Sequence, residues 1–302
     1  MSSGDTPAVA RRKVRMAIRD ARNAKGDTQT QVAEAMEWSL SKVMRIESGE
    51  VTITQNDLRP LLAYLGIKDR RTVEDLIQAA KASKQRRQWW DDRRYQGLLT
   101  AAMRQLIGFE AEAAVIRSFA PQVIPGWLQS EAYARAVTEG FIGDLTNDEI
   151  VARAAIRAER RNALLGRNPR PQLFALFDEA LLMREYGGPE ALRETLAAIS
   201  TAIENGLIRV RIHPLQRPYP PFGNYDLLYL TDENSHAVLY RESGPTDEIV
   251  DDSVRIARHR DAWDHMWEHS IGEEESARRI AAAAKRPVAG ADGRPAEKGS
   301  SD

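Results

Sequence analysis

Two short helix patterns, separated by one tight turn, lie within residues 28–49 and constrain the fold more than any other feature of the sequence. Thr28 and Gln31 have the spacing of a capping box, which predicts that a helix begins there. Ser39 is the N-cap of the next predicted helix, and Gly49 can adopt the left-handed conformation that ends it. The segment is therefore expected to form a helix-turn-helix.

The apolar pattern predicts that these two helices belong to a bundle of five. The expected ranges are about 9–24, 28–36, 40–47, 56–65 and 71–87. Ala33 is small where the second helix is expected to cross the third, and the apolar contacts at the crossing are assigned to Val32, Met36, Val43 and Ile46. The third helix is thereby held outward, where it could enter the major groove of DNA.

Residues 28–49 resemble the helix-turn-helix of the XRE and phage-repressor family. One departure is Glu37, which stands where the family usually has Gly in the turn. A left-handed non-Gly residue is strained by about 1 kcal/mol, so the turn is expected to differ locally. The resemblance implies double-stranded DNA as a partner. The alternative interpretation of the segment is an ordinary pair of core helices.

The same resemblance assigns roles to individual residues of the segment. The residues expected to face base edges, with their neighbours on the helix, are Ser39, Leu40, Ser41, Lys42, Met44 and Arg45. Arg45 is the best candidate reader, because a guanidinium can bond guanine O6 and N7 together. Gln29 matches a position that contacts a DNA phosphate in that family. Lys42 has an alternative interpretation, as a surface lysine that contacts only solvent. Arg22 and Glu47 match a structural ion pair.

Charge divides along the chain although the net charge is only −1. Residues 1–90 carry 17 Lys and Arg against 11 Asp and Glu, whereas the remainder carries 26 against 33. A basic module before an acidic one fits a part that meets phosphates and a part with another task. The chain has no cysteine, and no apolar run approaches the length of a membrane span, so a cytoplasmic protein without disulfides is expected.

The second half of the chain predicts an α+β domain. Helices are expected at about 131–140, 148–165, 189–205 and 247–269, and strands at about 171–177, 207–213, 225–230 and 237–241. The fold class is thus an all-α, phage-repressor-like N-terminal domain followed by an α+β domain with a small, mostly antiparallel sheet. The expected boundaries are 1–88 for the DNA-binding domain, 89–272 for the second domain and 273–302 for a disordered tail.

The second domain also resembles a known family. Its motifs include Ile107–Ala113, Val123–Arg135, Phe177–Ala180, Gly187–Pro189 and Ile208–Leu215. These motifs are similar to those of the C-terminal domain in a large family of actinobacterial regulators. That domain resembles the antitoxins of toxin–antitoxin systems. The resemblance implies a small partner protein encoded nearby.

Catalysis and metal binding are the alternatives considered for this domain. The candidates for acid–base chemistry are Asp178, Glu179, Arg184 and His213, but adjacent carboxylates at a helix start are more simply explained as a cap. His265 and His269 have the spacing of a zinc pair, yet no third ligand is evident nearby. No phosphate loop or dinucleotide motif is present, so no enzyme activity, catalytic residue, cofactor or metal is expected.

These features together predict a sequence-specific, dimeric DNA-binding transcriptional regulator. Its operator is expected to be an inverted repeat, and its second domain to bind the small partner protein. The alternative is a ligand-sensing repressor with a small-molecule pocket in the second domain. An enzyme that carries a DNA-binding domain is the remaining possibility.

Overall fold

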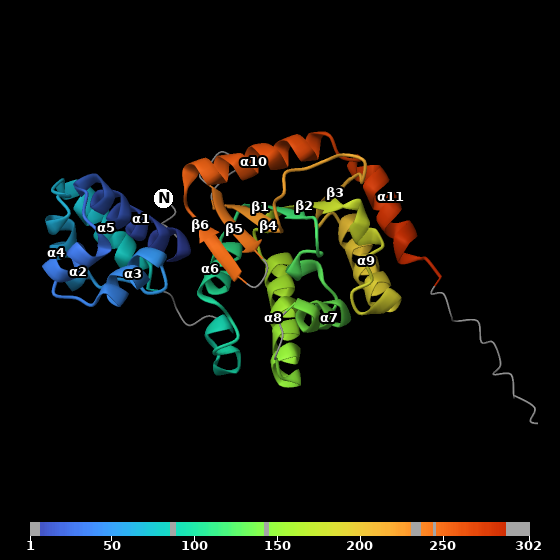
Figure 1. Ribbon diagram of the computed structural model, residues 1–302, viewed down its shortest axis with the longest axis horizontal. Helices are drawn as coiled ribbons and strands as arrows, with labels where there is room; N and C mark the ends of the chain where they lie inside the picture. The colour runs from blue at the N-terminus through green and yellow to red at the C-terminus, as the bar shows by residue number, and fades with distance from the viewer. Residues whose placement is uncertain (1–6, 85–88, 142–144, 231–236, 244–245, 288–302) are drawn as a thin grey trace, which may run out of the picture. The chain divides into compact units, whose positions relative to one another are not determined.

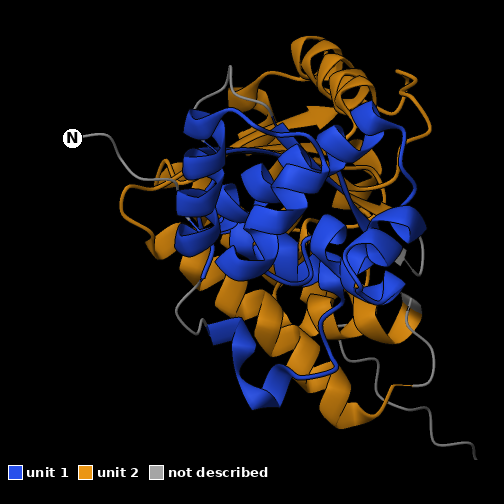
Figure 2. Cartoon of the chain, turned by 90° about the vertical axis from the view of Figure 1, so that its left-hand side faces the viewer, with its two compact units in different colours: residues 1–116, 228–240, 247–251 blue, residues 117–227, 241–246, 252–302 orange. Residues whose placement is uncertain are grey.

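The computed structural model describes residues 7–84, 89–141, 145–230, 237–243 and 246–287 (Figure 1). The chain divides into two compact units, coloured separately in Figure 2. The first comprises residues 1–116, 228–240 and 247–251, and the second comprises residues 117–227, 241–246 and 252–302. The predicted boundary at 88/89 follows residues 85–88, which are outside the described residues.

The N-terminal region is helical, as predicted, and residues 7–84 form five helices. They are α1 (Pro7–Lys25), α2 (Gln29–Ala35), α3 (Leu40–Ser48), α4 (Gln55–Tyr64) and α5 (Arg70–Ala82). Their shared core contains Ile18, Leu58, Leu62 and Ile77, all of them at most 1% exposed. Each such side chain stabilises the bundle by roughly 1.5–3 kcal/mol relative to exposure, so this core holds the helices in one arrangement.

The first unit continues beyond these helices, and one of its later residues stabilises the start of α1. After the short helices η1 (Trp89–Asp91) and η2 (Arg93–Tyr95), α6 spans Ala101–Glu110. The Glu112 carboxylate then accepts hydrogen bonds from the backbone N–H groups of Ala8, at 2.9 Å, and Val9, at 3.1 Å. The first N–H groups of a helix have no partner within it, so Glu112 acts as a distant N-terminal cap.

The described residues form a sheet of six strands, which is larger than the small sheet predicted and contains one pair known to be parallel. The strands are β1 (Val115–Ala120), β2 (Gln172–Asp178), β3 (Arg209–His213), β4 (Tyr225–Tyr229), β5 (Ala237–Ser243) and β6 (Thr246–Val250), in the order β3-β2-β1-β4-β5-β6. Strands β2 and β3 pair in parallel, with Phe174 opposite Arg209. The helix α9 (Gly188–Glu204) lies between them in sequence and provides the crossover that parallel strands require.

Strands β1 and β6 were not predicted. β1 carries Arg117 and Ser118 among its apolar residues, and the strand is covered on both faces, so no alternation marks it. β6 begins Thr-Asp-Glu, a sequence that also suits the start of a helix. The predicted helix 247–269 is accordingly wrong over its first residues: α10 spans Ser253–Glu268 and is capped by Asp252.

The remaining elements belong to the second unit. They are η3 (Gly126–Leu128), α7 (Glu131–Phe141), α8 (Asn147–Gly166), η4 (Glu179–Leu182) and α11 (Glu273–Ala284). In Figure 1, α7 lies beside α8, and α9 lies beside α11. Among the described residues, no helix is both long enough and apolar enough to cross a membrane.

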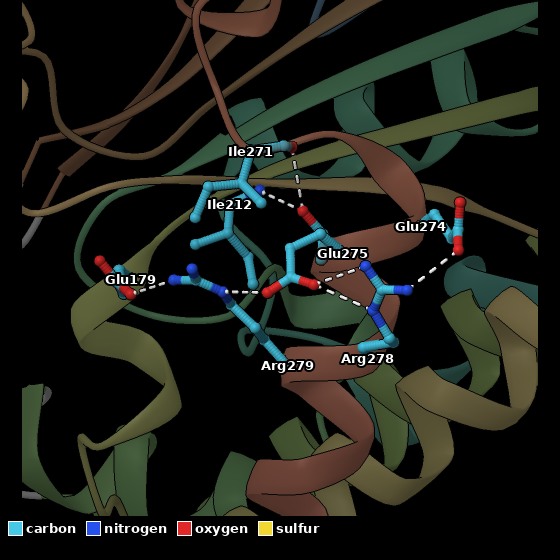
Figure 3. Close-up of polar contacts among 8 residues, drawn as sticks. Glu179, Ile212, Ile271, Glu274, Glu275, Arg278 and Arg279 are labelled. Carbon is cyan, nitrogen blue, oxygen red and sulfur yellow. Dashed lines mark hydrogen bonds and ion pairs between the residues drawn. The ribbon is translucent and has the colours of Figure 1, made fainter.

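The helix α11 corrects the prediction of a disordered tail from residue 273. Ser276 is fully buried, accepts a hydrogen bond from the Ile212 N–H at 3.0 Å and donates one to the Ile271 carbonyl at 3.0 Å. Figure 3 shows Ile212 and Ile271 beside each other, with Arg279 pointing toward Glu179. Arg279 reaches Glu179 at 2.7 Å. These contacts fix the helix against β3, and residues 288–302 of the predicted tail are outside the described residues.

Candidate nucleic-acid interface

Local side-chain caps fix the ends of α2 and α3. Thr28 Oγ1 accepts a hydrogen bond from the Gln31 N–H at 3.2 Å, and Gln31 Oε1 accepts one from the Thr28 N–H at 2.8 Å. Ser39 Oγ accepts from the Lys42 N–H at 3.2 Å, and Gly49 ends α3 with a φ of 80°. Both helices therefore begin where the sequence predicted, and the cap of each one satisfies a backbone N–H group of its first turn.

The turn between α2 and α3 contains the strained residue that the sequence indicated. Glu37 has a φ of 55°, and it alone among the described non-glycine residues has a positive φ. The following Trp38 N–H donates to the Ala33 carbonyl at 2.8 Å, which closes the turn. Glu37 adopts the conformation for which Gly is better suited, at a cost of about 1 kcal/mol.

A buried polar network holds α1, α2 and α3 together beneath the turn. Arg22 donates from Nε to Glu47 Oε1 at 2.7 Å and from Nη2 to Glu47 Oε2 at 2.9 Å. The Gln29 amide donates to Glu47 Oε2 at 2.8 Å. The hydrogen bonds that Arg22 donates to the Glu47 carboxylate raise the pKa of Arg22 above its ordinary value, so the guanidinium stays charged. The network fixes where α3 lies on the bundle.

The outward face of α3 carries most of the predicted base-reading residues. Leu40 is 42% exposed and Met44 is 50% exposed, while Ser41 and Arg45 are exposed as well. Val43 and Ile46 lie on the opposite face and are buried. Leu40 and Met44 are four residues apart on the helix, so their exposed apolar side chains lie side by side on this face.

Three predicted residues already have partners in the protein. Lys42 Nζ lies 3.1 Å from Asp57 Oδ2 and 3.9 Å from the centre of the Trp38 ring. These two contacts hold the lysine side chain in place, although it is only half-buried. Arg45 Nε lies 3.5 Å from Glu50 Oε2, with both side chains largely exposed. Gln29 takes part in the network with Glu47. Their roles toward DNA stay predictions.

Models of two known domain families match most of the chain. Residues 103–282 match the model of a domain of unknown function, DUF5753. The chain belongs to the DUF5753 family. Residues 16–90 match a helix-turn-helix domain, which supports a DNA-binding regulator. No curated protein and no solved structure matches the chain significantly.

Within the DUF5753 region, the residues considered for catalysis are all engaged in structural contacts. Asp178 Oδ1 accepts from the Ala180 N–H at 2.8 Å and caps η4, and Glu179 accepts from the Leu215 N–H at 3.2 Å as well as binding Arg279. The two ring nitrogens of His213 contact Ser270 Oγ at 3.2 Å and the Arg217 carbonyl at 3.1 Å. These contacts position the ends of β2 and β3.

His265 and His269 have the spacing of a zinc pair, although no metal was expected there, and they make a local structural contact. Nδ1 of His269 lies 2.8 Å from the His265 carbonyl, one turn earlier on the same helix. Within the described ranges, no group of three or more His, Cys, Asp or Glu residues is arranged to hold a metal ion.

A cluster of arginines on α1 was missed by the sequence analysis. Asp251, at the end of β6, lies 3.1 Å from Arg12 Nε, 2.7 Å from Arg15 Nη1 and 3.9 Å from Arg19 Nη1. Arg15 is 5% exposed, and its burial lowers the pKa of the guanidinium, with Arg12 and Arg19 acting in the same direction. The repeat of Arg along one face of α1 was visible in the sequence, but its carboxylate partner was not.

Proposed function

We propose that this protein is a transcriptional regulator that reads a specific double-stranded DNA sequence with α3. The observation that carries the proposal is the exposed face of α3, with Leu40, Met44 and Arg45 in water and the other face fixed by the Glu47 network. The major groove of B-DNA is about 12 Å wide and admits one helix. The apolar side chains suit thymine methyl groups, and Arg45 suits a guanine.

The test is selection of binding sites from random duplex DNA, followed by affinity measurements on three variants. Arg45→Ala is expected to weaken specific binding by about 1–3 kcal/mol and to relax the preference at one base position. Arg45→Lys keeps the charge but loses the bidentate geometry, so it should relax that preference to a similar extent. Gln29→Ala should weaken binding to all sequences alike. Equal losses on operator and random DNA for Arg45→Ala would remove Arg45 from base reading.

We propose that the regulator acts as a homodimer on an inverted-repeat operator. A helix of nine residues contacts too few base pairs to select one site in a genome. Two copies related by a twofold axis would read half-sites about 10 bp apart or a multiple of that. Analytical ultracentrifugation with the selected DNA tests this, and a single chain on an asymmetric site would contradict it.

We further propose that the DUF5753 domain has no catalytic role and binds a small partner protein encoded nearby. The resemblance to an antitoxin-like domain of actinobacterial regulators suggests the partner, and the acidic balance of residues 91–302 favours a basic surface on it. Co-purification of the neighbouring small protein tests the complex. If the partner weakens operator binding tenfold, DNA must weaken partner binding tenfold, a coupling of about 1.4 kcal/mol.

A ligand-sensing repressor is the second candidate function. The observation that favours it is a cavity of about 810 Å³ in the first unit, which Arg45 of α3 helps to line. This pocket is thus not confined to the second domain, where the sequence led us to expect it. This volume lies within the range of small-molecule sites, roughly 300–1,000 Å³. A ligand there would raise the melting temperature in proportion to ln(1 + [L]/Kd).

A further inference from the structure

The cavity in the first unit is strongly cationic. It lies among α1, the loop after α3, the end of α5, η1 and α6, and every residue that lines it belongs to the first unit. Six cationic side chains line it, against the two carboxylates Glu50 and Asp91: Arg11, Arg12, Arg15, Arg45, Lys84 and Arg104. Trp90 and Phe109 are the aromatic residues of its wall.

The carboxylates of the protein do not balance this charge. Arg12 and Arg15 share the single buried carboxylate of Asp251, whose side chain is 2% exposed. Glu50 lies 3.5 Å from Arg45, and Asp91 lies 3.8 Å from Arg104. Arg11 also interacts electrostatically with Glu112. The six cations of the site still outnumber these four carboxylates.

Arg15 supplies a second observation. Its side chain is 6% exposed, and while Nη1 binds Asp251 at 2.7 Å, Nη2 is buried and has no hydrogen-bond partner. A buried guanidinium with an unsatisfied N–H group is costly, and proteins ordinarily pair it. An anion in the cavity would offset the excess charge of the cluster and relieve the repulsion among its guanidinium groups.

We propose that this cavity binds a small organic polyphosphate. A phosphate group matches the guanidinium fork. Several phosphates are needed to engage together the cations of α1, Lys84 after α5, and Arg104 of α6. The volume leaves room for an organic part beside Trp90 and Phe109. This inference deepens the second candidate function, because it names the ligand class of that cavity, but binding itself does not require DNA.

The test uses the full chain without DNA and three probes: ATP, pyrophosphate and inorganic phosphate. Isothermal titration calorimetry at physiological salt should show one ATP per chain, weaker pyrophosphate and little inorganic phosphate. The double variant Lys84→Gln/Arg104→Gln removes two less buried cations of the wall and should weaken ATP binding at least roughly tenfold. Arg71→Gln, which changes an exposed arginine at the start of α5 away from the cavity, should bind ATP like the wild type.

A steric variant separates a site from general attraction between charges. Ala101 lines the cavity and is exposed at the first position of α6, so Ala101→Phe fills space without removing a cation. It should weaken ATP binding while circular dichroism shows an intact fold. No binding of ATP or pyrophosphate by the wild type would overturn the proposal. ATP binding as tight as in the wild type by both the double variant and Ala101→Phe would also overturn it.

A DNA measurement distinguishes the remaining outcome. If the double variant binds operator DNA more weakly and no probe binds the wild type, the cations contact the DNA backbone, and the ligand proposal is wrong. Site-selected DNA binding that survives in this variant, together with lost ATP binding, would support the proposal. If the wild type enriched no sequence from random duplex DNA, that result would count against α3 as the helix that reads bases. It would not change the interpretation of the ATP titration.

Discussion

Replacement of Glu47 by Ala should destabilise the helix-turn-helix more than any other single change to its polar residues. Arg22 would keep its hydrogen bond to the Asp27 carbonyl, at 2.9 Å, but lose both bonds to the carboxylate. Its side chain is only 13% exposed, so a charge would be left in a poorly solvated place. Breaking such a pair costs about 3–5 kcal/mol, and the remaining carbonyl contact favours the lower end, about 3 kcal/mol.

Hydrogen exchange followed by mass spectrometry measures this effect locally. A loss of about 3 kcal/mol predicts roughly a hundredfold faster amide exchange in peptides from α1, α2 and α3, with smaller changes elsewhere. Glu47→Gln keeps the shape and one acceptor, so its effect should be about half as large in free energy. Glu34→Ala, which changes an exposed glutamate on α2, is the matched control.

Two outcomes would refute the reasoning about Glu47. Less than about a fivefold change in exchange for Glu47→Ala would show that the pair contributes little, as surface pairs do. Equal effects of Glu47→Ala and Glu34→Ala would show the same. The double variant Arg22→Leu/Glu47→Leu removes both charges and should recover part of the loss, because no charge is then left buried alone.

Three further predictions concern other parts of the chain. Glu37→Gly and Glu37→Asn should each raise the unfolding free energy by about 0.5–1 kcal/mol, because both residues tolerate the positive φ; lower melting temperatures for both would contradict the strain. Burial lowers the pKa of His213 below 6.5, so the unfolded chain binds the proton more readily and stability is lost as pH falls from 7 toward 5. His213→Gln should flatten that dependence of the melting temperature, and an unchanged profile would exclude His213 as its source. Ser276→Ala leaves the Ile212 N–H without its partner and should cost about 1–3 kcal/mol in chemical denaturation, whereas Ser200→Ala, on the exposed side of α9, should cost little.

The helix-turn-helix could be predicted from the sequence because its signals are local. Thr28, Ser39 and Gly49 each fix a helix end through atoms three residues away or fewer, and Glu37 marked the strained turn. The exposed face of α3 followed from the same register. Its contacts with DNA were inferred from resemblance and stay predictions, since a sequence motif carries no geometry of the bound base.

The missed elements depend on partners that are distant in sequence. Asp251 meets Arg12 across 239 positions, and Ser276 meets Ile212 across 64. Neither the cationic cavity nor the docking of α11 can be read from local patterns. The helix α11 did carry local signals, the pairing of Glu274 with Arg278 and of Glu275 with Arg279, each four residues apart. They were outweighed by its alanine-rich composition.

The cap that Glu112 provides to α1 has a consequence for work with fragments and hybrids. The first helix of the DNA-binding bundle begins on a carboxylate 104 residues further along the chain. A fragment cut before residue 89 would leave the N–H groups of Ala8 and Val9 to water and would fray at its start. A chimera that exchanges the DNA-binding segment between relatives must therefore carry a compatible residue at position 112, so the two segments are not freely interchangeable.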